Sequence, residues 1–232
     1  MNMAKPNTAK PVKPRDAASL VLVDHTGLEP RILMGKRHAK MSFIPDAFVF
    51  PGGKLDPHDH EALPATSLPG DQSFGHTGAS QAKTLALAMA AVRETFEETG
   101  MLLADKGDIG PATGETWGQF RDLGVAPALH HVSFMARAIT PVQSPIRFHA
   151  RFFKADASAL TGTLKGSGEL SEIDWYPLSE ALKLPIIDVT EFVLTELKNS
   201  AEGNPRALPP LYCYLNEKPR VLEPRVLERK VR

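Results

Sequence analysis

The chain has 232 residues, 42% of them hydrophobic, which is enough to bury a sizeable core in one domain. Its 27 Lys and Arg residues balance its 27 Asp and Glu residues, and we find no aromatic-rich basic patch, so we expect no nucleic-acid partner. No apolar stretch approaches the roughly 18 residues that span a bilayer, no signal-peptide core is seen, and Cys213 is the single cysteine. We therefore predict a cytoplasmic protein with no membrane association and no internal disulfide.

The two ends of the chain differ in composition from its middle. Residues 1–15 hold three prolines among lysines, which predicts a disordered N-terminal tail. Residues 201–232 form a basic segment that holds five prolines and a tandem Pro-Arg-Val-Leu-Glu repeat starting at 219 and 224. We predict one domain over 16–200 and a Pro-rich basic extension over 201–232, which could pack on the domain, meet an anionic ligand or join a homodimer interface.

Strands and helices are expected to alternate along the middle of the chain. Apolar runs and turn residues predict strands near 17–23, 30–36, 47–50, 132–140, 147–155 and 172–177. Helical periodicity predicts helices near 82–99, 115–122, 178–183 and 189–199. Asp188, with Glu191 three residues later, predicts a capping box at the start of the last helix. This alternation is consistent with a layered α/β/α arrangement.

The strand predicted near 47–50 runs into a Pro-Gly-Gly turn that ends with Gly52 and Gly53. Glycine adopts backbone angles that are closed to other residues and lets main-chain groups approach a ligand closely. The turn could therefore give a metal ion a carbonyl ligand or receive a phosphate group.

A stretch without sustained apolar periodicity, residues 57–81, follows this turn. Its prolines and glycines predict a surface loop beside the site, where it could act as a lid or a substrate-selecting wall. The loop also holds His58, His60 and His76. They lack a cysteine partner and the helical spacing of a zinc site, so we interpret them as surface residues.

The end of the helix predicted near 82–99 carries three carboxylates, on Glu94, Glu97 and Glu98. Their spacing of i, i+3 and i+4 places them on one face, next to the negative end of the helix dipole if Gly100 ends the helix. Such a cluster is unfavourable unless a cation lies over it, and hard oxygen ligands suit Mg²⁺, Mn²⁺ or Ca²⁺. The ordinary alternative is a solvated acidic face with Arg93 pairing Glu97.

An apolar stripe on the same helix would anchor the cluster to the core. It consists of Leu85, Met89, Val92 and Phe96.

The glycine turn and the acidic helix together resemble the box of the Nudix hydrolases, which runs G, five residues, E, seven residues, REUXEEXGU with U apolar. The matching residues are Gly53, Arg93, Glu94, Glu97, Glu98, Gly100 and Met101. Arg93 follows Gly53 by 40 positions where the standard box has 14, so 26 extra residues interrupt the motif. The first glutamate of the box is missing: Asp59 stands six residues after Gly53, and it either takes that role or leaves it vacant.

The interruption is similar to that of a Nudix branch that includes coenzyme A diphosphatases. Further segments that resemble this branch are Phe43-Ile44-Pro45, Thr140-Pro141 and Arg147-Phe148-His149-Ala150-Arg151-Phe152-Phe153. A coenzyme A signature is half present, because residues 33–37 fit its start while Ser42 and Asp46 occupy the positions of its second Arg and its Gly.

The resemblance implies a fold of the α+β class, a Nudix-type α/β/α sandwich with a mixed β-sheet. It implies Mg²⁺ or Mn²⁺ as the cofactor, held by Glu94, Glu98 and the Gly52 carbonyl, with Glu97 binding directly or through water. Arg93 would orient a glutamate and offset the charge of the cluster.

Contacts to the substrate and the general base are less defined by the resemblance. Arg37, Gly53, Arg147 and Arg151 are the candidates for binding the substrate, and alternation places the last two on one face of their strand. Glu169 and Glu172 precede Trp175, where Nudix proteins often carry an extra acidic residue. We favour Glu172 slightly as the base, with solvated loop charges as the alternative.

Three functions follow from the resemblance. The leading one is a divalent-metal-dependent hydrolase that cleaves the diphosphate bond of a nucleoside diphosphate derivative, with coenzyme A or acyl-coenzyme A favoured. The alternatives are an ADP-ribose or dinucleotide diphosphatase, and a non-catalytic module that binds a nucleotide, which has less need to keep three clustered glutamates.

Overall fold

The computed structural model describes residues 12–41, 44–70 and 72–224. Most of the predicted N-terminal tail, Ser42, Phe43 and all but the first residue of the second Pro-Arg-Val-Leu-Glu copy lie outside these ranges. Within them, no helix is both long and apolar enough to cross a bilayer.

The α-helices are α1 (Gln81–Thr99), α2 (Glu115–Asp122), α3 (Leu178–Ala181) and α4 (Asp188–Ala201). The strands are β1 (Arg15–Asp24), β2 (Arg31–Arg37), β3 (Phe48–Val49), β4 (Gly52–Lys54), β5 (Met101–Leu102), β6 (Ala104–Lys106), β7 (Val125–Pro127), β8 (Ser133–Ile139), β9 (Phe148–Asp156), β10 (Thr161–Gly162), β11 (Leu170–Pro177), β12 (Leu211–Leu215) and β13 (Lys218–Leu222). Short 3₁₀ helices are η1 (Pro57–His60), η2 (Gln72–His76), η3 (Leu129–His131) and η4 (Ala157–Ala159).

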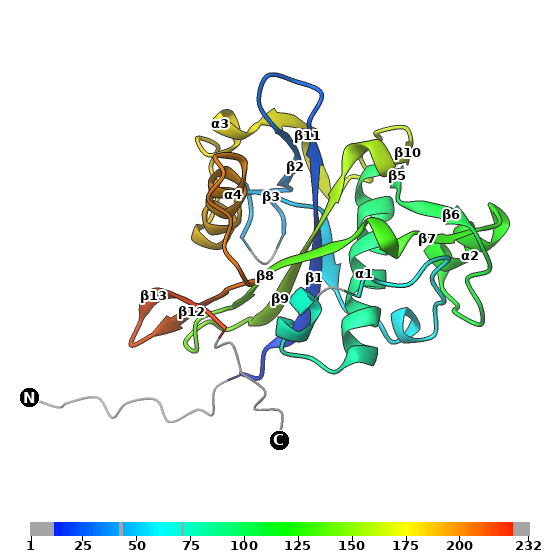
Figure 1. Cartoon of the computed structure of the whole chain (residues 1–232), viewed down its shortest axis with the longest axis horizontal. Coiled ribbons are helices and arrows are strands. Elements are labelled where there is room, and N and C mark those ends of the chain that lie inside the picture. Colours follow the sequence, from blue (N-terminus) through cyan, green and yellow to red (C-terminus); the bar gives the residue numbers. More distant parts are fainter. Residues whose placement is uncertain (1–11, 42–43, 71, 225–232) are drawn as a thin grey trace, which may run out of the picture.

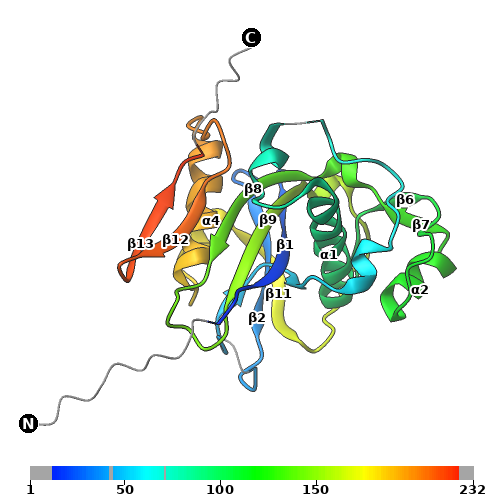
Figure 2. The ribbon, with the colours of Figure 1, turned by 90° about the horizontal axis from the view of Figure 1, so that it is seen from below.

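A mixed sheet of nine strands forms the middle layer. Its order is β11-β2-β1-β9-β8-β12-β13, with β3 added to β2 and β4 added to β1. The pairs β1–β9 and β8–β12 are parallel, while β1–β2 and β8–β9 are antiparallel. Figure 1 shows α1 on one face of the sheet and α4 on the other, and Figure 2 shows the strands between them from a second side. The α+β sandwich predicted from the sequence is confirmed.

β1 lies at the centre because its side chains are apolar on both faces. Leu20 and Leu22 pack in the cluster that includes the buried residues of α1. Val21 and Val23 point to the opposite face and join the cluster that includes α4. A strand that is buried on both sides reads as a continuous apolar run, and residues 20–23 are such a run.

α1 forms where the sequence is rich in good helix formers, and residues at both of its ends fix its length. Ser80 caps its start by accepting a hydrogen bond from the Lys83 amide. Gly100 ends it in the left-handed conformation, with φ 70°. Met89 and Val92 of the predicted stripe are fully buried, and Leu85 and Phe96 pack against the same cluster. The glutamate-bearing end of the helix is therefore fixed to the core.

The capping box predicted for the last helix is wrong. Ile187 is the N-cap of α4 and provides no side-chain cap. The Asp188 carboxylate instead accepts from the neighbouring Val189 amide at 2.8 Å and bonds to Tyr212. A tertiary hydrogen bond to a side chain on β12 thus competes with the local capping motif.

Part of the predicted C-terminal extension belongs to the sheet. β12 pairs in parallel with β8 through Leu211 and Tyr212, and β13 folds back on β12. Tyr212 stacks on Phe192 of α4, with ring centroids 5.0 Å apart. The proline content concealed this hairpin because the prolines lie before and at the edge of its strands.

The two arginines predicted to meet a substrate phosphate are buried and hydrogen-bonded within the protein. Arg147 donates to the carbonyl groups of Thr140 and Val12. Arg151 is 1% exposed, forms an ion pair with Asp16 and donates to the carbonyl of Thr77 at 3.2 Å. Both side chains thus connect strands and loops.

His149 lies among the cations beside Arg151. Its Nε2 is 3.3 Å from the guanidinium of Arg137, and its carbonyl accepts from Arg151. Burial, together with the charges of Arg151 and Arg137, lowers the pKa of His149 to about 4, while Asp16 opposes the shift and Lys83 adds to it. The neutral imidazole is therefore the form that this cluster accepts.

We expect this lowered pKa to weaken the fold at mildly acidic pH. The unfolded chain takes up a proton at His149 below about pH 6.5, whereas the folded chain does so only near pH 4, so stability is full above the first value and falls toward the second. Between pH 7.5 and 5.5 the wild type should lose about 1 kcal/mol more than His149→Gln, after a discount for solvent screening. Urea unfolding at both pH values measures this difference, and equal losses in the two proteins would contradict it.

Candidate active site

The glycine turn and the end of α1 meet directly. The Gly52 amide donates to Oε2 of Glu98 at 2.9 Å, although 46 residues separate the two in the sequence. Glu98 is 5% exposed, so its carboxylate is held in the interior with this backbone donor. Pairing of β4 with β1 positions the turn, and the α1 core contacts position the helix.

Gly53 allows the backbone to approach Glu94 more closely than any other residue could. A Cβ atom at Gly53 would lie 2.4 Å from Cδ of Glu94 and 2.5 Å from both carboxylate oxygens. Such distances are too short for any stable contact, so a side chain at this position would displace Glu94. The turn therefore needs glycine here for space.

Arg93 joins three segments at the base of the cluster. Its guanidinium donates to both oxygens of Asp59, at 2.7 and 3.0 Å, and to the Lys54 carbonyl at 3.0 Å. It also donates to Glu94 at 2.9 Å. Asp59 has no exposed side-chain surface, so a bidentate ion pair is the means by which its charge is accommodated. The sequence left open whether Asp59 takes the role of the missing first glutamate of the box. In the structure, Asp59 binds the guanidinium of Arg93 and holds it in place.

Glu97 points toward α2 and is the most exposed of the three glutamates. Its carboxylate accepts from Arg93 at 3.3 Å and from the Thr116 hydroxyl at 2.5 Å. Thr116 lies in the first turn of α2, where backbone amides favour a negative charge. Nothing in the sequence signalled Thr116, because its contact depends on how α2 packs on α1.

Burial raises the pKa of two of the glutamates. The pKa of Glu98 is raised to about 8, mainly by burial, with the nearby charge of Glu94 adding to the shift. The pKa of Glu94 is raised to about 7 by burial, against the influence of Arg93. A cation beside these groups would favour their ionised forms.

The oxygen donors of the cluster fit a divalent metal ion that also binds the substrate. In the described part of the chain, no three His, Cys, Asp or Glu side chains form a site that could hold an ion by themselves. Mg²⁺ usually binds one or two carboxylates, waters and substrate phosphates, so such a cage is not required. Glu94, Glu98 and the Gly52 carbonyl are oxygen ligands of the kind it prefers.

A cavity of about 780 Å³, which we call the sheet-side cavity, opens from the cluster across the α4 face of the sheet. Glu94, Glu97 and Glu98 line one end of it. Its basic residues are Arg15, Arg37 and Lys54, and its aromatic residues are Phe50, Phe148, Phe152, Tyr212 and Tyr214. A cavity of this size takes a nucleotide-sized ligand.

Comparisons with known proteins agree with this geometry. No protein-family model matches the chain. The crystal structure of a NUDIX hydrolase from Alicyclobacillus acidocaldarius is similar with a TM-score of 0.63 and 27% sequence identity, over 80% of this chain and 91% of that one. The chain has the Nudix fold.

A relative of known sequence extends the comparison. "Putative nudix hydrolase 7" of Caenorhabditis elegans is 27% identical over 179 residues, which cover 72% of this chain and 53% of the relative. The chain thus spans about half the length of this curated relative. Both similarities are to Nudix hydrolases at 27% identity, and they agree with the resemblance carried by the glycine turn and the glutamates of α1.

The two acidic residues considered for the Nudix general base are placed differently. Glu169 lines the sheet-side cavity, and its negative charge contributes to raising the pKa of Glu98. Glu172 lies at a bulge of β11 with φ 49°, and its carboxylate pairs with Lys36 at 3.0 Å. Glu169 thus lies at this cavity and Glu172 does not, and Glu172 as the base stays a prediction.

Of the four residues predicted to bind the substrate, two line the sheet-side cavity and two do not. Arg37 and Gly53 line the sheet-side cavity, and the positive charge of Arg37 opposes the rise in the pKa of Glu98. Arg147 and Arg151 do not line it. On β9, Ala150 and Phe152 face the cavity, so the alternation that places Arg151 on the α1 face also turns it away from the site.

The segment predicted as a surface loop, residues 57–81, is anchored at both ends. η1 at its start carries Asp59 and is itself capped by Asp56, which accepts from the His58 amide at 2.9 Å. Its last residue, Gln81, opens α1. His58 contacts Glu61 within the segment and Thr113 outside it, as an ordinary polar residue would.

We expect a methyl group at Gly53 to disturb metal binding without unfolding the chain. In Gly53→Ala the new Cβ would push the Glu94 carboxylate aside. Mn²⁺ affinity, measured by calorimetric titration, should fall by about 10-fold or more. The matched control is Gly75→Ala, since a Cβ there meets nothing within 4 Å. Equal affinity in the two variants would contradict the proposed position of Glu94.

Proposed function

We propose that the chain is a divalent-metal-dependent hydrolase that cleaves the diphosphate bond of a nucleoside diphosphate derivative, with coenzyme A or acyl-coenzyme A favoured. The observation that carries the proposal is the contact of the Gly52–Gly53 turn with the buried carboxylate of Glu98 and the partly buried carboxylate of Glu94. Two acids side by side in a poorly solvated region are unfavourable, and a site for a cation explains why they are there.

The chain's own residues have separate roles in this reaction. A bound Mg²⁺ or Mn²⁺ would offset the charge of the diphosphate and make water more acidic. Glu94 and Glu98 would hold the ion, and Arg93 keeps Glu94 in place through its hydrogen bond. Glu97, held by Thr116 and Arg93, and Glu169 are the two acidic groups left to orient water or accept its proton.

The lining of the sheet-side cavity supports a nucleotide end with an additional phosphate. Arg15, Arg37 and Lys54 provide positive charge, and the aromatic side chains offer faces for a base. Coenzyme A has such an end, because its adenosine carries a 3′-phosphate. ADP-ribose and dinucleoside polyphosphates lack this phosphate and remain the competing substrates.

The backbone of the loop that follows Arg37 also supports coenzyme A as the substrate. Asp46 stands where the signature has glycine, and its φ is 59°. Aspartate is one of the few residues that adopt this left-handed conformation readily. The departure in sequence thus keeps a backbone shape suited to glycine, while Ile44 and Met41 of this loop line the cavity.

We expect Glu98→Gln to reduce turnover by about 100-fold or more while the fold persists, because the amide keeps the shape but cannot bind the cation as an anion. Turnover of coenzyme A, ADP-ribose, NADH and dinucleoside polyphosphates is measured with Mg²⁺, Mn²⁺ or EDTA. Circular dichroism controls for unfolding. Cleavage that continues in EDTA would reject the mechanism.

The products identify the substrate in the same assay. Mass spectrometry that finds 3′,5′-ADP with 4′-phosphopantetheine would select coenzyme A. Cleavage of ADP-ribose or dinucleotides alone would select the competing activity, and nucleotide binding without cleavage of any substrate would indicate a binding module.

We expect Glu169→Gln to lower kcat by about 100-fold, the lower end of the effect of a general base. The matched control is Glu172→Gln, which makes the same chemical change at an exposed glutamate on the same segment and should leave kcat within about 2-fold. A larger loss in the control would restore Glu172 as the base.

A further inference from the structure

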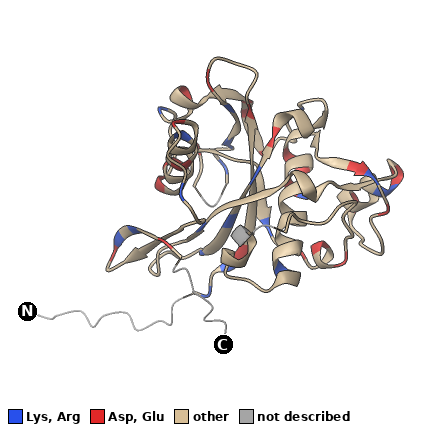
Figure 3. Cartoon of the chain, in the orientation of Figure 1, with Lys and Arg blue, Asp and Glu red and all other residues tan. Residues whose placement is uncertain are grey.

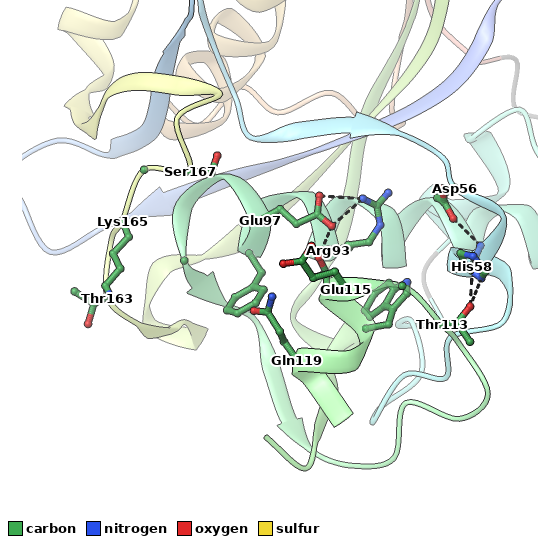
Figure 4. A pocket seen from close by; sticks show the side chains of 16 residues that line it. Asp56, His58, Arg93, Glu97, Thr113, Glu115, Gln119, Thr163, Lys165 and Ser167 are labelled. Carbon is green, nitrogen blue, oxygen red and sulfur yellow. Dashed lines mark hydrogen bonds and ion pairs between the residues drawn. The ribbon is translucent and has the colours of Figure 1, made fainter. Parts of the chain in front are cut away.

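A second cavity, of about 740 Å³, lies on the other side of Glu97 from the sheet-side cavity. We call it the α2 cavity, since Thr116 and Gln119 of α2 form one wall. Figure 4 shows Gln119 and Glu115 below Glu97 and Arg93, with Lys165 on one side and His58 with Thr113 on the other. Glu97 lines both cavities, so they adjoin at the glutamate cluster.

The segment from Thr163 to Glu169 also connects the two cavities. Thr163, Lys165 and Ser167 line the α2 cavity, and Glu169 lines the sheet-side cavity. Backbone hydrogen bonds connect this segment to the end of α1. The Lys165 amide donates to the main-chain carbonyl of Thr99 at 2.7 Å, and the Ser167 amide donates to the main-chain carbonyl of Glu98 at 3.3 Å. A ligand that contacts this segment would therefore be held at a fixed distance from the glutamates.

A further feature of the α2 cavity is Trp117, whose indole lies in its wall. Its indole is 1% exposed, and among the described residues Nε1 has no hydrogen-bond partner. Buried polar groups are nearly always hydrogen-bonded, and leaving one unpaired costs about 1–3 kcal/mol. The indole of Trp117 thus brings an unpaired donor to the wall of the α2 cavity, although Nε1 itself is covered in the structure.

The charges of the α2 cavity favour a neutral ligand. Asp56, Glu97 and Glu115 contribute three negative charges, against positive charges on Arg93 and Lys165. The positive charge of Arg93 is already engaged by Asp59 and Glu94. A phosphate or carboxylate would meet net repulsion there, whereas hydroxyl and carbonyl oxygens would find both donors and acceptors.

We infer that the α2 cavity binds the second arm of the diphosphate substrate, an uncharged group rich in hydroxyl or carbonyl oxygens. The nucleotide arm would lie in the sheet-side cavity, which Arg15, Arg37 and Lys54 line, and the diphosphate would lie at the glutamates between the two. This inference rests on the proposed function and adds where each half of the substrate binds. Pantetheine and a terminal ribose are both arms of this chemical class.

The first test compares intact substrates with a nucleotide that lacks the second arm. Gln119→Leu removes a polar group from the α2 cavity and should raise KM for coenzyme A or ADP-ribose about 3- to 10-fold, with kcat nearly unchanged. The inhibition constant of ADP should stay the same, because ADP fills only the nucleotide arm. The matched control is Gln143→Leu, outside both cavities, which should change neither value.

The second test reports on Trp117 without relying on turnover. The chain has two tryptophans, so Trp175→Phe leaves Trp117 as the single indole emitter. In this variant combined with Glu169→Gln, which keeps the glutamates that would hold the ion, and supplied with Mg²⁺, coenzyme A or ADP-ribose should shift or quench the emission, and ADP should not.

The outcomes separate this inference from the proposed function. Wild-type protein that cleaves a diphosphate substrate, with an unchanged KM in Gln119→Leu and no Trp117 response, would overturn the two-arm arrangement alone. Wild-type protein that cleaves none of the substrates would overturn the function. A Trp117 response to ADP as strong as to the intact substrate would place the nucleotide in the α2 cavity and also overturn the inference.

Discussion

The organisation of the site depends on one buried guanidinium. Arg93 binds Asp59 from the segment after the turn, the Lys54 carbonyl at the end of β4, and Glu94 and Glu97 on its own helix. Without this positive charge, four carboxylates would approach one another in a poorly solvated region. With it, the acids are held apart and oriented, and Glu98 is left to the Gly52 amide.

The sandwich serves the site by fixing its two halves to different parts of one core. α1 is held by the cluster on one face of the sheet, and β4 is held by its pairing with β1. The α4 face forms the floor of the sheet-side cavity, so the layer that stabilises the fold also provides a surface for a ligand. Charged residues of both signs are spread around this frame, as Figure 3 shows.

The sequence predicted elements whose signals are local. α1 and α2 lie within one residue of their expected ranges, since periodicity and the glycine stop depend on neighbouring residues alone. The apposition of the turn and the helix followed from the resemblance to the Nudix box. The contact of Asp59 with Arg93 and that of Thr116 with Glu97 could not be predicted, because they depend on how distant segments pack.

Errors in the sequence interpretation have a common physical cause. Alternation correctly grouped Arg151 with one face of β9, but it could not tell which face borders the cavity. Proximity in sequence likewise could not separate Glu169 from Glu172, which a bulge in β11 directs apart. The Asp188 capping motif was displaced by Tyr212, a partner from a hairpin that the sequence did not reveal.

The anchoring of residues 57–81 has a consequence for how such proteins are recognised. Asp59 fixes the beginning of the segment and Ser80 fixes its end, and Ala62 and Thr77 are buried between them, so residues added at an exposed point such as Gly70 would not move the glutamates. A long insertion here costs little, because the entropy of closing a loop grows slowly with its length. Sequence motifs that assume a constant spacing between the double glycine and the helix would overlook chains of this kind. A motif would find them if it requires an acidic residue shortly after the double glycine and an arginine on the helix.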